Sequence, residues 1–260
     1  MDDINDVLTR AYREILADLP LHWIDGSCFQ DVEFAKLSGL FLPGTSDAYL
    51  QAPQRIMVVG RETKTWNVIS AQTPFADLDE YIHRAMIKQQ RFLKKNLPDR
   101  RDKGESFFNL LRAIAKNHGS DGIAWANLFC SSWKGNSPMA WKKHFPALLA
   151  VSERLLKAQI EILKPDIIIF ANGTTSAKYR RQLFPHKGEH SVCSRHVDFE
   201  GYGIAIEQLW MYYIYEKIPC YRIQHPSSSS TAARSARRYL LKEVLNRGCS
   251  GYPDMGVNRP

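Results

Sequence analysis

Two patterns of apolar residues alternate along this chain. Short continuous apolar runs, rich in β-branched residues, are typical of strands buried on both faces of a parallel sheet. Such runs occupy residues 56–59, 122–129, 166–170 and 219–223. Segments with apolar residues at helical spacing occupy residues 5–18, 79–96, 106–116 and 145–163, and another helix is expected to begin at residue 231. The alternation predicts an α/β fold, a three-layer α/β/α sandwich around a central, mainly parallel sheet of about four strands.

We expect a single domain over residues 1–260. Its core spans about residues 50–245, because the strand and helix patterns lie there. Residues 1–49 contain a helix followed by an irregular segment in which Gly, Pro and Ser recur. Residues 249–260 have no periodicity, so we expect them to form a peripheral tail.

The composition is that of an ordinary globular protein, with 44% apolar and 24% charged residues. No run of about 18 apolar residues is present, so no membrane span is expected. The acidic N-terminus lacks a signal-peptide pattern, which predicts an intracellular, cytoplasmic protein. Five scattered cysteines include no Cys-x-x-Cys pair, and this argues against a disulfide framework and against a zinc or iron–sulfur site. We therefore expect no metal or other cofactor.

The net charge of +8 makes a polyanionic partner plausible, although charge alone is a loose indicator. Basic residues gather on the expected helix at 79–96, where they indicate either a solvated face or contacts with phosphate. Residues 175–202 are polar and basic, and they predict an insertion or a DNA-facing loop. The aromatic-rich residues 210–215 predict a helix or strand near the core.

Polar side chains follow three of the expected strands at the point where each strand ends. Gly60 and Glu62 end the first, Asn127 lies at the end of the second, and His225 ends the last. In open α/β sheets, ligands bind outside the carboxyl ends of strands, so chemistry is expected there. Two of these residues also have a structural interpretation: Gly60 as the residue of a tight turn, and Asn127 as a turn former or a hydrogen-bonded core residue.

Together these strand ends resemble the uracil-DNA glycosylase superfamily. The residues that carry the resemblance are 56–62, 125–129, 163–173 and 221–228. The resemblance implies a monofunctional glycosylase that flips a base out of DNA and hydrolyses its N-glycosidic bond, which leaves an abasic site.

The resemblance also implies roles for individual residues. Glu62 corresponds to the residue that positions a water and stabilises positive charge on the sugar. Asn127 corresponds to the reader of the Watson–Crick edge, and His225 to the donor that stabilises the departing base. Phe75 stands at the spacing of the base-stacking aromatic residue, with Trp66 as the alternative.

Further residues are expected to contact the base or the DNA backbone. We place Gly60, Arg61 and Lys64 beside the base. Four serines and a helix start follow His225, and hydroxyls with unpaired amides at a helix N-terminus form an anion site. The residues expected to contact phosphate are Ser227, Ser228, Ser229 and Arg234.

The sequence departs from the superfamily pattern at two places. Thr63 and Lys64 replace a proline and the Tyr or Gly that crowds the 5-position of the pyrimidine in common members. Ser229 replaces an intercalating leucine, so the residue that fills the vacated base stack must come from elsewhere. The long segments 70–104 and 175–202 are candidates for this wedge and for an enlarged pocket.

These departures favour a modified pyrimidine over plain uracil, and modified cytosine of phage DNA, hence antiphage defence, is one candidate. A conventional uracil repair enzyme is an alternative, as is a nucleic-acid-binding module without catalysis. A hydrolase of free nucleosides is disfavoured by the basic helix after His225, since a nucleoside has no phosphate chain. We expect DNA as the partner and a monomer as the working state.

Overall fold

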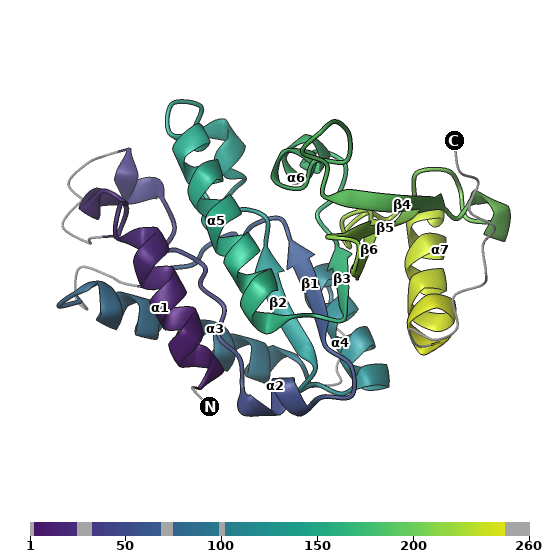
Figure 1. Cartoon of the computed structure of the whole chain (residues 1–260), viewed down its shortest axis with the longest axis horizontal. Coiled ribbons are helices and arrows are strands. Elements are labelled where there is room, and N and C mark those ends of the chain that lie inside the picture. Colours follow the sequence, from purple (N-terminus) through teal and green to yellow (C-terminus); the bar gives the residue numbers. More distant parts are fainter. Residues whose placement is uncertain (1–2, 25–32, 69–74, 99–101, 248–260) are drawn as a thin grey trace.

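The structure is a computed structural model that describes residues 3–24, 33–68, 75–98 and 102–247 (Figure 1). Its helices are α1 (Ile4–Leu16), α2 (Asp47–Gln51), α3 (Leu78–Asn96), α4 (Ser106–His118), α5 (Phe145–Leu163), α6 (Ala177–Leu183) and α7 (Thr231–Tyr239). Its strands are β1 (Ile56–Gly60), β2 (Ile123–Asn127), β3 (Ile167–Phe170), β4 (Cys193–Asp198), β5 (Leu209–Ile214) and β6 (Ile218–Ile223). The expected tail at 249–260 lies outside the described residues.

Within the described residues, six strands form one mixed sheet in the order β2-β1-β3-β6-β5-β4. The four strands expected from the sequence are β2, β1, β3 and β6, and neighbours among them pair in parallel. The expected number of about four was wrong, because β5 pairs antiparallel with β6 and β4 pairs antiparallel with β5. Both added strands lie beyond β6, at one edge of the sheet, so the parallel part still consists of the four expected strands.

Helices cover both faces of the sheet, and a separate apolar core lies on each face. Along β1, Met57 and Val59 join the core that contains α1, α3 and α5, while Ile56 and Val58 join the core that contains α4 and α7. This alternation follows from the two-residue period of a strand. Both faces are therefore apolar, which explains the continuous apolar runs, and the arrangement is compatible with the expected three-layer sandwich.

The helix ends follow the local sequence. α5 ends before Lys164, which has a left-handed backbone (φ 45°), and Pro165 follows it. α7 begins after Ser230, whose hydroxyl accepts the amide of Ala233 at 3.2 Å. The start of α7 and both ends of α5 match the expected positions, because proline and the capping serine mark them in the sequence.

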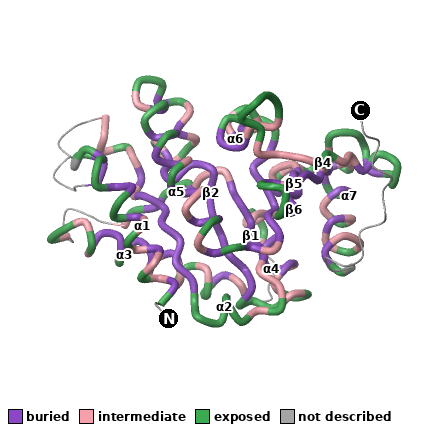
Figure 2. Tube along the Cα trace, viewed as in Figure 1, coloured by how far each residue is buried: buried purple, intermediate pink, exposed green. Residues whose placement is uncertain are grey.

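The structure shows the secondary structure of two segments that the sequence did not assign to a helix or strand. Residues 175–202 were expected to be an insertion or loop, but they contain α6 and the edge strand β4. The aromatic-rich segment at 210–215 lies in β5. Figure 2 shows β1 and β2 buried along their length, whereas β4 is only partly buried. A partly exposed strand at the sheet edge has a weak apolar pattern, which explains why its sequence resembled a loop. No helix among the described residues has the length and apolar character needed to cross a membrane.

Candidate functional site

A pocket of about 730 Å³ lies at the carboxyl ends of the four parallel strands. In the strand order, β2 lies on one side of β1 and β3 on the other. The chain that leaves β1 therefore continues toward β2, whereas the chain that leaves β3 continues toward β6, in the opposite direction. Such a point opens a crevice in α/β proteins, and ligands bind there. The wall is built from the segment after β1, the first turn of α4, the end of β2, and the turns after β3 and β6. Most of the polar residues singled out from the strand ends therefore meet in one cavity.

Gly60 makes room for Asn127. A Cβ atom at Gly60 would lie 2.6 Å from Asn127 Oδ1 and 3.1 Å from the ring of Phe107. Gly60 is the last residue of β1 and is not among the described glycines with positive φ. Backbone conformation is therefore not what requires a glycine at residue 60; the glycine is needed for space beside the amide.

The amide of Asn127 is held by one contact, and its NH2 group stays free to donate. Its Oδ1 accepts a hydrogen bond from Trp125 Nε1 at 3.2 Å, and this contact assigns the orientation of the amide. Its Nδ2 is buried and has no partner among the described residues. An unpaired buried donor costs about 1–3 kcal/mol, which a bound acceptor would offset. Asn127 is therefore prepared to donate to a ligand in the pocket.

His225 is held by the residue two positions after it. The backbone amide of Ser227 donates to Nδ1 at 3.2 Å, and the Ser227 hydroxyl lies 2.7 Å from the same nitrogen. Because a backbone amide can only donate, Nδ1 must be the unprotonated nitrogen. The proton of the neutral ring is then on Nε2, which is left to donate to a ligand. Gly173 allows the turn after β3 to lie close to His225, since a Cβ atom at residue 173 would be 3.2 Å from His225 Cβ.

The surroundings of His225 favour its neutral form. Burial lowers the pKa of His225 below its ordinary value of 6.5, and the positive charges of Arg61, Arg237 and Lys64 lower it further. The imidazole is therefore a neutral hydrogen-bond donor at physiological pH. The same three cations place positive potential around the imidazole, so this part of the pocket favours an anion.

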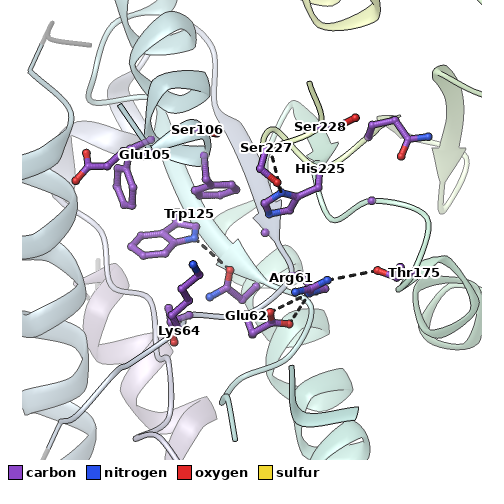
Figure 3. A pocket seen from close by; sticks show the side chains of 18 of the residues that line it. Arg61, Glu62, Lys64, Glu105, Ser106, Trp125, Thr175, His225, Ser227 and Ser228 are labelled. Atoms are coloured by element: carbon purple, nitrogen blue, oxygen red, sulfur yellow. Dashed lines mark hydrogen bonds and ion pairs between the residues drawn. The ribbon is translucent and has the colours of Figure 1, made fainter. Parts of the chain in front are cut away.

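Arg61 and Glu62 form an ion pair at the pocket rim (Figure 3). Arg61 Nε donates to both carboxylate oxygens of Glu62, at 2.7 and 2.9 Å, and the Glu62 side chain is only 6% exposed. Arg61 Nη1 lies 3.4 Å from the hydroxyl of Thr175, in the turn after β3. The sequence placed Arg61 beside the base, whereas in the structure its observed contacts are with Glu62 and Thr175.

An aromatic wall faces these polar groups, and the sequence interpretation missed most of it. We use this name for Trp66, Phe92, Phe107, Phe108 and Trp125, all of which line the pocket. Their rings pack edge to face or tilted, with centroids 5.6 Å apart for Trp66 and Phe92, 5.4 Å for Phe92 and Phe108, and 5.1 Å for Phe108 and Trp125. The only sequence feature that indicated this wall was the pair of phenylalanines at the start of the helix at 106–116. Apolar residues at a helix start are, however, as compatible with core packing as with a ligand wall.

The two residues considered as base-stacking groups occupy different places. Trp66 lines the pocket but is 3% exposed, and it packs against Phe41 and Trp125. Phe75 is not among the residues that line this pocket, and its ring packs against Tyr81 at 5.1 Å. Phe107 lies against Gly60 in the pocket wall, so it is better placed than Phe75 to cover a bound ring.

The residues expected to contact phosphate separate into two groups. Ser227 and Ser228 line the pocket, and Arg237 Nη2 donates to the Ser228 carbonyl at 3.0 Å, which holds the turn after β6. Ser229 and Arg234 are exposed and do not line it. They lie on the surface beside the pocket, between the end of β6 and the first turn of α7.

The described residues contain no group of three or more His, Cys, Asp or Glu side chains placed to hold a metal ion. Among the cysteines, Cys28 and Cys249 lie outside the described residues, while Cys130, Cys193 and Cys220 are free thiols. No protein-family model matches the sequence, and no curated protein matches it either. Function must therefore be inferred from the chemistry of the pocket.

Proposed function

We propose that this chain is a monofunctional DNA glycosylase that acts on a flipped-out uracil or modified pyrimidine. The observation that carries the proposal is the convergence of Glu62, Asn127 and His225 on one pocket at the carboxyl ends of β1, β2 and β6. In the reaction, water adds to the anomeric carbon, the N-glycosidic bond breaks, and the base leaves with the bonding electrons. The products are the free base and an abasic site.

Each of the three residues meets a separate chemical need of base excision. A neutral His225 donates from Nε2 to a base oxygen, where negative charge develops as the bond breaks. The Glu62 carboxylate stabilises the positive charge that develops on the sugar and orients the attacking water. Asn127 Nδ2 donates to an acceptor on the edge of the base. Non-catalytic binding of DNA requires no such combination, which favours an enzyme over a binding module.

A modified pyrimidine remains our preferred substrate over plain uracil. The pocket volume falls in the range that holds drug-sized ligands, which is more than one pyrimidine ring requires. Lys64 stands in place of the residue that crowds the 5-position in common members of the superfamily, and it is an exposed side chain at the pocket, while Thr63 before it is buried. The aromatic wall supplies flat apolar surface for a bulky substituent, and Lys64 supplies a donor. Modified cytosine in phage DNA, attacked in the cytoplasm as a defence, fits this description.

The direct test is an assay for abasic sites on a panel of DNAs. The panel contains uracil, thymine, hypoxanthine, 5-hydroxymethylcytosine, and phage DNA with glucosylated cytosine. We expect excision of at least one modified pyrimidine. Cleavage confined to uracil would identify a conventional repair activity, and tight DNA binding without release of any base would identify a binding module.

Replacing Asn127 with Asp is expected to change which base is released. The substitution keeps an acceptor for Trp125 Nε1 but replaces the free Nδ2 donor with a second acceptor. The mismatch should cost about 1–3 kcal/mol, so excision of the preferred base should fall about 5- to 150-fold. The measurement is the single-turnover rate on each base of the panel. An unchanged order of preference would remove Asn127 from base recognition.

Replacing Phe92 with Ala is expected to affect bulky bases selectively. Phe92 belongs to the aromatic wall and is 40% exposed, so the substitution should leave the fold intact. We expect kcat/KM for a glucosylated base to fall about tenfold, and that for an unsubstituted base to change little. Tyr202→Ala is the matched control, since Tyr202 is also 40% exposed but lies outside the pocket. Equal effects of Phe92→Ala on both bases would contradict a substituent site at the wall.

A further inference from the structure

Arg61 has more hydrogen-bonding capacity than its contacts use. A guanidinium carries five N–H donors in a planar fork. Nε alone holds both oxygens of Glu62, Nη1 reaches Thr175 only at 3.4 Å, and Nη2 has no partner among the described residues. About 30% of the Arg61 side chain is exposed, compared with 6% for Glu62. The guanidinium therefore binds the buried carboxylate with one edge and presents its remaining donors at the rim of the pocket.

We propose that Arg61 and Thr175 form a binding site for a DNA backbone phosphate, and that the bound phosphate fixes Arg61 as the positioning residue for Glu62. This assignment rests on the proposed function. It replaces the expectation that Arg61 contacts the base, and it adds a phosphate site to the one expected at Ser227 and Ser228. The site takes a phosphodiester because its donors are a charged fork and a neutral hydroxyl, which together match two oxygens of one phosphate.

The neighbouring turn supports this placement. The close approach of Gly173 to His225 brings the turn after β3 beside the turn after β6. In Figure 3, Thr175 lies on the same side of the pocket as His225 and Ser227, and Arg61 lies between Thr175 and Glu62. A strand that inserts one nucleotide into the pocket could therefore place one phosphate at Ser227 and Ser228 and another at Arg61 and Thr175. The reacting sugar would then lie between them, next to Glu62.

One side chain serves both anions because of its shape. Arginine binds the carboxylate through Nε and can still bind phosphate through both Nη groups. Lysine carries one point charge and cannot hold two anions in fixed directions. The charge of residue 61 is therefore expected to determine phosphate binding, and the planar shape of its side chain is expected to determine the position of Glu62.

Two measurements on Arg61→Gln and Arg61→Lys test the proposal. The first is the dependence of the DNA dissociation constant on salt, since each lost phosphate contact lowers the slope of log affinity against log salt by about 1. The second is the single-turnover rate of base release at saturating DNA. We expect Arg61→Gln to lose about one unit of slope and at least about tenfold in rate. Arg61→Lys should recover the slope but not the rate.

Arg154→Gln is the matched control for the slope. Arg154 lies on α5 and is not among the residues that line the pocket; its side chain is 48% exposed and forms an ion pair with Asp18 at 3.8 Å. This variant should keep the wild-type slope and rate. Thr175→Val removes a hydroxyl from an exposed residue without a change in charge, so it should weaken DNA binding about threefold with an unchanged slope.

The outcomes separate this inference from the proposed function. An unchanged slope for Arg61→Gln, or unchanged affinity for Thr175→Val, would overturn the phosphate site. A wild-type rate for Arg61→Lys would overturn the positioning role. If the wild-type protein releases no base from any DNA, the proposed function and the positioning role both fail, whereas the slope and affinity measurements still decide whether the phosphate site exists.

Discussion

His225→Ala should slow base release about 100- to 1,000-fold while DNA affinity is largely retained. The expected loss is that of one preorganised donor to a developing anion. In the proposed reaction His225 is such a donor, because Ser227 occupies Nδ1 and leaves the proton on Nε2. The measurement is the single-turnover rate at saturating DNA, with affinity determined separately on the same substrate.

The pH profile distinguishes this role from a structural one. Since burial and nearby cations lower the His225 pKa, the ring stays neutral until the pH falls below its ordinary value of 6.5. The wild-type rate should therefore decline only as the pH drops through that lowered pKa, and the decline should be absent from His225→Ala. His190→Ala is the control, because His190 is exposed and does not line the pocket. Full activity of His225→Ala would remove this residue from the mechanism.

Much of the central fold could be predicted from the sequence because the parallel strands are buried on both faces. Continuous apolar runs mark β1, β2, β3 and β6, and proline, glycine and serine mark where their neighbouring helices begin or end. β4 could not be predicted in the same way. It is a partly exposed edge strand whose polar residues, including Arg195 and His196, resemble those of a surface loop.

The candidate site was predicted in part for a related reason. Glu62, Asn127 and His225 lie at the end of an apolar strand or two residues after it, and parallel topology then brings strand ends together. Pocket residues that come from helices have no comparable feature in the sequence. Phe92 and Phe107 reach it from α3 and α4, and their sequence positions are equally compatible with a core. The pairing of Arg61 with Glu62 depends on side-chain geometry, which adjacency in sequence does not reveal.

Glu62→Gln should reduce base release by at least about 100-fold, because it acts on two charges at once. It removes the carboxylate that, in the proposed reaction, faces the developing positive charge of the sugar. It also leaves the Arg61 guanidinium without its anionic partner, so an uncompensated cation would lie near the same sugar. Glutamine has nearly the same shape and keeps one oxygen for Arg61 Nε, and DNA affinity should therefore be retained. Glu105→Gln is the matched control, since Glu105 also lines the pocket but is bound by Arg112 at 2.8 Å.

A double-mutant cycle shows whether the two charges act as a unit. If Arg61 contributes to the chemical step through Glu62, the double variant of Arg61→Gln and Glu62→Gln should be no slower than Glu62→Gln alone. Removing the cation even relieves the repulsion that the single substitution creates. The cycle uses single-turnover rates at saturating DNA, so the weaker binding expected from the loss of Arg61 does not enter. Losses that simply multiply would mean that each residue acts independently, and Glu62 would then orient its water without the help of the arginine beside it.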